Sequence, residues 1–101
     1  MKSVRITAVR RTVYPDLIQR YENPLEHPCD VAEGAVFVSE NGQKPDSLCA
    51  EAWGCMAAYI AQLAAGGGNF FDGWMKNPHS ALISCNDGFR PVSFLVETIE
   101  D

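Results

Sequence analysis

The stretch LCAEAWGCMAAYIAQLAAG, residues 48–66, decides the fold. Apolar side chains recur in it at positions 49, 53, 56, 60 and 63, which is helical spacing. This periodicity predicts a long helix over residues 48–65 with its apolar stripe packed against a sheet. Asp46 or Ser47 is expected to cap the start of the helix, and Gly66 is expected to end it.

The remaining faces of this predicted helix are poor in charge and rich in alanine. A helix that is apolar all round is normally covered all round, and a small domain has too little chain to cover it alone. We therefore expect a homo-oligomer in which the helix 48–65 contacts another subunit. The run barely reaches the length of a membrane span and contains a carboxylate, so no membrane association is expected.

Four segments around the helix have strand character, and two of them flank the hairpin turn at residues 86–88. They are residues 2–13, 35–39, 81–85 and 91–99. The first strand is basic and the last is acidic, so the two are predicted to pair. A short helix over residues 16–21 follows Pro15. The expected class is α+β: an antiparallel sheet of about four strands, with one long apolar helix and one short helix packed on it.

Length, composition and charge narrow the class of protein. The chain has 101 residues, of which 47% are hydrophobic, and a net charge of −5. These values predict a single domain over residues 1–101. No basic run could neutralise phosphates, so a nucleic-acid partner is not expected. The first residues lack a secretory pattern, which predicts a cytoplasmic protein with reduced thiols.

The four cysteines carry the strongest chemical signal. Cys49 lies in the first turn of the predicted helix, where the helix dipole favours a thiolate, although a buried apolar role stays open. Cys55 lies about 240° further around the helix, so it is assigned to packing. No Cys-x-x-Cys pair is present. A metal site of Cys29, Cys49 and Cys85 would therefore have to be assembled by the fold.

Several other side chains are candidates for the walls of a small-molecule site. They are Trp53, Phe70, Trp74 and Arg90. The aromatic residues after the glycine run 66–68 either cap the core or line an apolar pocket. Arg90 either pairs with Asp87 across the turn or binds a ligand carboxylate through two hydrogen bonds.

The chain also resembles a family of small, uncharacterised, cysteine-containing proteins of about this length, found mainly in anaerobic bacteria and archaea. The resemblance rests on Pro28-Cys29, on CAEAW at 49–53, on GGNF at 67–70, on Trp74 and above all on CNDGFRPVSF at 85–94. In the family pattern, Cys29, Cys49 and Cys85 match recurring cysteines and Cys55 does not. Ser84 stands where a second cysteine often precedes Cys85. The resemblance implies a shared small fold and an anaerobic setting, but no activity.

Three functions stay open at this point. The first is a small ligand- or metal-binding domain in which Cys29, Cys49 and Cys85 hold zinc or iron, because neighbouring thiolates repel one another without a cation. The second is a thiol-dependent enzyme with Cys49 as nucleophile or redox thiol and His27 or His79 as base. The third is an oligomeric interaction module without catalysis. The sequence assigns no catalytic residues beyond these alternatives.

Overall fold

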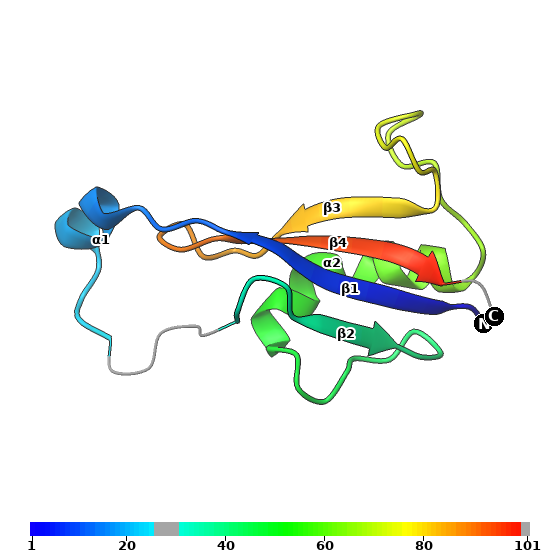
Figure 1. Cartoon of the computed structure of the whole chain (residues 1–101), viewed down its shortest axis with the longest axis horizontal. Helices are drawn as coiled ribbons and strands as arrows, with labels where there is room; N and C mark the ends of the chain where they lie inside the picture. Colours follow the sequence, from blue (N-terminus) through cyan, green and yellow to red (C-terminus); the bar gives the residue numbers. More distant parts are fainter. Residues whose placement is uncertain (26–30, 100–101) are drawn as a thin grey trace.

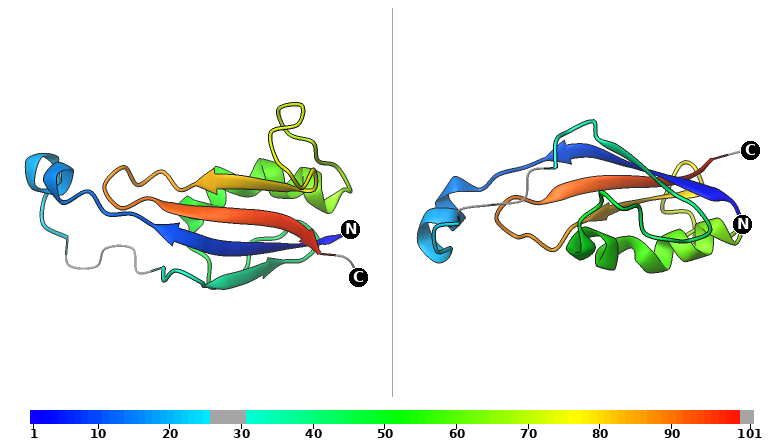
Figure 2. Two further views of the ribbon diagram at one scale, coloured as in Figure 1. Left: turned by 45° about the horizontal axis from the view of Figure 1, so that its top comes forward. Right: turned by 90° about the horizontal axis from the view of Figure 1, so that it is seen from below.

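The computed structural model describes residues 1–25 and 31–99. In chain order its elements are β1 (Ser3–Arg11), α1 (Pro15–Tyr21), β2 (Val36–Ser39), α2 (Ala50–Ala64), β3 (Ser80–Ser84) and β4 (Val92–Ile99). The strands form one antiparallel sheet in the order β2-β1-β4-β3, and α2 covers one face of it (Figures 1 and 2). The predicted α+β class with a four-stranded antiparallel sheet is confirmed within the described residues.

The first and last strands are neighbours at the centre of the sheet. Their register places Arg5 opposite Glu97, and these two side chains form an ion pair. The pairing predicted from the opposite charges of the two segments is therefore confirmed. The same register sets Ser3 opposite Ile99, so the start of β1 and the end of β4 lie side by side.

The hydrophobic core lies between α2 and the facing side of the sheet. Successive side chains of a strand point to opposite faces, so every second residue of the central strands enters the core. The buried apolar residues of the strands are Val4, Ile6, Ala8, Ala81, Val92, Phe94 and Val96. The buried residues of α2 are Ala52, Met56, Ile60, Leu63 and Ala64. Each large apolar side chain buried in this way contributes about 1.5–3 kcal/mol to folding.

The helix α2 begins later than the sequence predicts. Its N-cap is Cys49, and no side chain caps it. Asp46 and Ser47 do not reach that position because the chain turns before the helix, where the Leu48 N–H donates to the Pro45 carbonyl at 3.1 Å. The helix has 15 residues, so the long helix over residues 48–65 is not confirmed. No helix in the described ranges is long and apolar enough to cross a bilayer.

The end of α2 confirms Gly66 as the stop. Gly66 has a φ of +91°, a left-handed conformation that glycine adopts without strain. Its N–H donates to the Leu63 carbonyl at 3.0 Å, and the Gly67 N–H donates to the Gln62 carbonyl at 2.8 Å. These two bonds make a Schellman motif, which satisfies carbonyls that the end of a helix leaves free.

The short helix α1 does not pack on the sheet, so this part of the predicted fold is wrong. None of its residues is buried, and it lies beyond the end of β1, near the β3–β4 turn (Figure 1). The reason is that α1 has only seven residues and two central apolar ones, Leu17 and Ile18, which are half-buried. The backbone N–H groups of Thr12 and Tyr14 donate to carbonyls of the β3–β4 turn. These hydrogen bonds continue the pairing of β1 with this part of the chain up to the start of α1.

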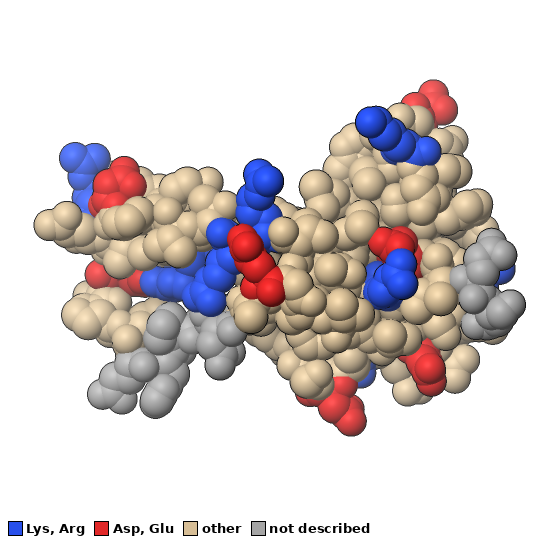
Figure 3. Space-filling view, viewed as in Figure 1, with Lys and Arg blue, Asp and Glu red and all other residues tan. Residues whose placement is uncertain are grey.

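The second face of the sheet carries no helix in the described part of the chain. Figure 3 shows this open face: one contacting basic and acidic pair lies within largely uncharged surface, and further charged side chains lie at the end of the sheet towards α1. The face includes the alternate residues of each strand that do not enter the core.

Candidate functional site: a pocket lined by two thiols

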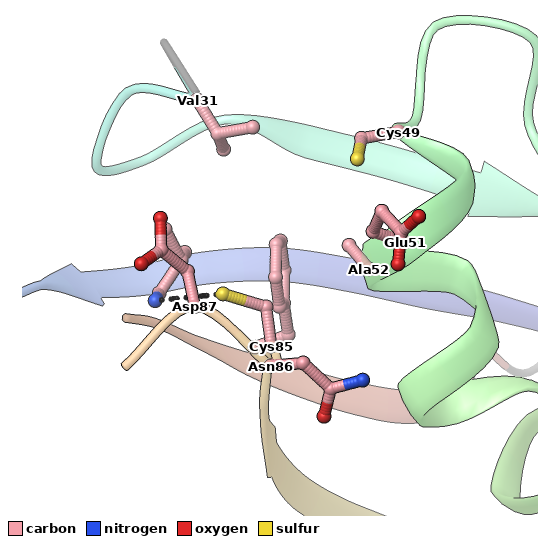
Figure 4. Close-up of a pocket in the computed structure, with 9 residues that line it drawn as sticks. Val31, Cys49, Glu51, Ala52, Cys85, Asn86 and Asp87 are labelled. Atoms are coloured by element: carbon pink, nitrogen blue, oxygen red, sulfur yellow. Dashed lines mark hydrogen bonds between the residues drawn. The ribbon is translucent and has the colours of Figure 1, made fainter. Parts of the chain in front are cut away.

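A pocket of about 300 Å³ lies between the start of α2 and the β3–β4 turn. Its walls are Val31, Cys49, Glu51, Ala52, Cys85, Asn86, Asp87, Val92 and Phe94. Figure 4 shows Val31 and Cys49 on one side of it and Cys85, Asn86 and Asp87 on the other. Two of the three cysteines predicted to form a site therefore line the same cavity, although they are far apart in sequence.

Cys49 reaches the pocket because it is the residue at which the chain enters α2. Its backbone is extended, with φ −59° and ψ 136°, and its side chain makes no capping hydrogen bond. The residue is exposed, so the alternative that it is a buried apolar residue is wrong. Figure 4 shows its sulfur pointing from the start of the helix towards the cavity.

Cys85 is held in place by the hairpin that follows β3. Its N–H donates to the Val92 carbonyl at 3.0 Å, and its sulfur accepts a hydrogen bond from the Val92 N–H at 3.3 Å. The thiol is half-buried. The ladder between β3 and β4 therefore sets the position of this sulfur, whereas that of Cys49 is set by the helix.

Cys55 belongs to the same neighbourhood, which helical geometry alone did not indicate. Burial is the main cause that raises the pKa of Cys55. The Asn86 backbone N–H acts in the opposite direction, and Cys85, Glu51 and Cys49 raise the pKa further through their charge. The Cys55 thiol also donates to the Glu51 carbonyl at 3.3 Å. Assigning Cys55 to packing alone missed its place beside the turn that carries Cys85.

The β3–β4 turn is stabilised by a cluster of charges. Asp87 accepts hydrogen bonds from the backbone N–H groups of Phe89 at 2.8 Å and Arg90 at 3.1 Å. The Arg90 side chain contacts Asp87 at 3.1 Å and forms a second, two-armed ion pair with Glu22. Burial alone would raise the pKa of Asp87, but these backbone donors and the guanidinium outweigh it and lower that pKa.

This cluster decides between the two interpretations of Arg90. The pairing of Arg90 with Asp87 across the turn is confirmed. Because two carboxylates already surround the guanidinium, Arg90 is not placed to bind the carboxylate of a ligand in this pocket.

The predicted aromatic residues lie elsewhere. Phe70 packs against Tyr59, with ring centroids 5.1 Å apart, beyond the end of α2. Trp74 packs against Phe71 in the loop before β3, with ring centroids 5.3 Å apart. Trp53 is half-buried against the core. None of these rings is among the described residues that line the thiol pocket.

The histidines and the third cysteine complete the set of predicted site residues. His79 contacts the Gly67 carbonyl at 3.2 Å, past the opposite end of α2, so it is not near Cys49 and cannot act as its base. His27 and Cys29 lie outside the described residues. Among residues 1–25 and 31–99, no group of three His, Cys, Asp or Glu side chains is arranged to hold a metal ion.

Comparison with protein-family models, with curated proteins and with solved structures finds no match to this chain. Membership of the cysteine-containing family therefore stays a prediction. The pocket and its residues are the observations from which a function is inferred.

Proposed function

We propose that the protein binds a small, largely apolar molecule, uncharged or positively charged, in the pocket between the start of α2 and the β3–β4 turn. The observation that carries the proposal is this pocket of about 300 Å³ with the thiols of Cys49 and Cys85 on its walls. Sites for small molecules commonly have this form, a mostly apolar cavity with a few polar groups that fix orientation.

The charge of the walls limits the class of ligand. Glu51 and Asp87 contribute carboxylates, and the described lining residues include no lysine or arginine. The nearby Arg90 is already paired with Asp87 and Glu22. An anion entering this pocket would meet negative charge without a compensating cation. This favours a neutral or cationic ligand.

The two thiols set a second requirement. Thiols are polarisable and weak hydrogen-bond partners, and as thiolates they bind soft metal ions and attack electrophilic carbon. The apolar walls formed by Ala52, Val92 and Phe94 match the body of a small hydrophobic molecule. A ligand with an apolar body and one soft or electrophilic atom would use both features.

A test of the charge requirement uses three ligands that share one ring: benzyl alcohol, benzylamine and benzoate. We expect the first two to shift the backbone amide NMR signals of Ala52, Cys85 and Val92 in a saturable titration. We expect benzoate to shift them much less. An absence of saturable shifts with all three compounds contradicts the proposal, and equal shifts with benzoate contradict its charge requirement.

The role of the thiols is tested with matched serine variants. A bound ligand should protect the thiols of the pocket from an alkylating reagent. In Cys49→Ser and Cys85→Ser, the ligand should protect the remaining pocket thiol less well. Cys55→Ser should change this protection little, because Cys55 does not line the cavity. Serine at position 49 is also a good N-cap, so this variant is expected to stay folded and to gain about 1 kcal/mol of helix stability. A loss of binding in it would therefore report on the thiol.

In a second version of this proposal, the same pocket binds a zinc or iron ion through cysteine thiolates. Cys49 and Cys85 lie on one pocket, which supports two of its three predicted ligands, and Cys29 is the predicted third. Metal content and the ultraviolet–visible spectrum of protein purified without oxygen test this version. Stoichiometric metal that Cys29→Ser removes would support it. A metal-free protein with four reactive thiols would exclude it and leave the organic ligand.

A further inference from the structure

The open face of the sheet carries more apolar surface than a solvent-facing sheet usually does. Antiparallel sheets with one wet face normally alternate apolar and polar residues along each strand. Across this face, one row of register partners reads Val36, Thr7, Leu95 and Leu82. Three of the four are apolar, and Val36 is 55% and Leu82 44% exposed. Such a surface is typical of a face that another protein covers.

The neighbouring row places a balanced charge pair in the middle of the same face. It reads Val38, Arg5, Glu97 and Ser80, and the two charged residues form an ion pair. Figure 3 shows the surroundings of the central charges to be largely uncharged. The chain as a whole has a net charge of −5. Two copies can therefore approach through this face with less repulsion than through the rest of the surface.

We propose that this face is the interface of a homodimer in which the open faces of two sheets pack together. The two-fold axis lies between the two sheets, parallel to the strands and midway between β1 and β4. Packed sheets lie about 10 Å apart with their side chains interdigitated. This axis sets β1 of one copy over β4 of the second, and β2 over β3. A two-fold interface requires one patch that is complementary to itself.

The register makes the face complementary to itself about this axis. Arg5 of each copy lies over Glu97 of the second copy, so the two ion pairs combine into a group of four alternating charges. In the apolar row, Val36 lies over Leu82 of the second copy and Thr7 lies over Leu95. Charge meets opposite charge, Val36 meets Leu82, and the Thr7 methyl group can pack on Leu95. Such complementarity is the condition for a specific interface.

The loop before β3 adds a contact at the side of this interface. Trp74 and Met75, with Leu95 and Glu97, line a hollow of about 390 Å³ next to the open face. Trp74 is 45% exposed. In the proposed dimer this hollow faces β2 of the second copy, near its Val38. The indole, which is partly in water in a single chain, would then be covered.

The outer side of α2 is the competing surface, because the alanine-rich sequence also predicts an interface there. It exposes Ala50, Ala58 and Ala61, which present little side chain and no pair of opposite charges. The open sheet face has larger apolar side chains and a self-complementary charge pair. These differences favour the sheet face over the helix.

Sedimentation velocity of the full chain over a range of concentrations tests the proposal. We expect a dimer whose Kd rises at least about tenfold with Leu82→Lys and little with Ala58→Lys, a matched exposed position on the outer side of α2. Emission from Trp74 should move to longer wavelength on dilution of the dimer, with Trp74→Phe as the control for Trp53. A wild-type chain that stays monomeric up to roughly 1 mM overturns the proposal. So does a dimer that only Ala58→Lys disrupts.

A charge exchange tests the axis itself. The double variant Arg5→Glu with Glu97→Arg keeps the ion pair within each chain, so it should fold and form its own dimer. Mixed with wild type, it should not form heterodimers, because like charges would then face one another across the interface. Native mass spectrometry of the mixture measures this. Heterodimers in statistical proportion would exclude the proposed axis.

Discussion

Arg90 and Glu22 form a two-armed ion pair between the β3–β4 turn and the residue that follows α1. Both side chains are largely shielded from water, with exposed fractions of 10% and 13%. The same guanidinium also holds Asp87, so one side chain joins the short helix to the wall of the thiol pocket. Because α1 buries no apolar residue, this ionic contact holds α1 in place, whereas α2 is held by its buried side chains.

Removal of one partner should loosen both regions. Glu22→Gln leaves the shielded guanidinium with Asp87 as its one carboxylate partner, and removing one member of a shielded ion pair is destabilising. We expect the Tm to fall by about 5 °C or more, and amide hydrogen exchange in α1 and the turn to become faster. The matched control, at concentrations below the Kd of the proposed dimer, is Arg5→Gln, which removes the more exposed pair with Glu97 and should shift the Tm less. Equal shifts would show that shielding adds nothing to the Arg90 pair.

Stability should also depend on the protonation of Asp87. Its pKa is below the usual value of 3.8, so the folded state binds the proton more weakly than the unfolded state. The stabilising effect is therefore complete above about pH 4 and is lost as the pH falls through the folded pKa. Urea denaturation between pH 2 and pH 5, as rough limits, measures this slope. In Asp87→Asn the slope should be smaller, and an unchanged slope would assign it to other carboxylates.

Gly68 and Gly54 should respond in opposite directions to the same substitution. A Cβ at Gly68 would collide with the Pro78 carbonyl oxygen and lie 3.1 Å from His79 Nδ1, whereas a Cβ at Gly54 meets nothing within 4 Å. Gly68→Ala must therefore push apart two backbone segments, and we expect it to lower the free energy of unfolding by about 1–3 kcal/mol. Gly54→Ala, on the exposed side of α2, should stabilise by about 0.5–1 kcal/mol. Chemical denaturation of both variants measures the contrast.

The thiols should differ in their rates of alkylation. Burial and neighbouring negative charge raise the pKa of Cys55, so less of it is thiolate at pH 8 than of an ordinary cysteine. Cys49 is exposed. With iodoacetamide, we expect Cys49 to react first and Cys55 to react more slowly than it does in urea-unfolded protein. Peptide mass spectrometry over time resolves the sites. If Cys55 reacts as fast in the folded chain as in the unfolded one, it is not shielded in the way proposed.

The sequence was a good guide to the sheet because its signals are local or complementary. The basic residues of β1 and the acidic residues of β4 indicated the central pair, and Gly66 indicated the end of α2. The start of α2 was wrong because Asp46 and Ser47 are equally suited to a turn, and the Pro45 carbonyl takes the Leu48 N–H before the helix begins. The position of α1 depends on Arg90, a distant residue that local patterns do not include.

The candidate site was predictable only in part, for a similar reason. Cys49 and Cys85 were proposed together and line one pocket. Helical geometry shows which residues share a side of α2, but not which loop lies next to each side, so it separated Cys55 from a neighbourhood in which it lies. Phe70 and Trp74 are close to the helix in sequence, yet they follow its far end and cannot reach a pocket at its start.

The central position of β1 and β4 has a consequence for how the chain folds. The two strands come from opposite ends of the sequence, yet all other strands are attached to them. The complete sheet cannot form until the loop over residues 12–91, between β1 and β4, has closed, and such closure slows folding. During synthesis, β1 has no central partner until β4 (Val92–Ile99) has left the ribosome. Until then β1 can pair only with the short β2, and its edge that will face β4 stays open. That interval is when the emerging chain is most open to aggregation or to binding by a chaperone.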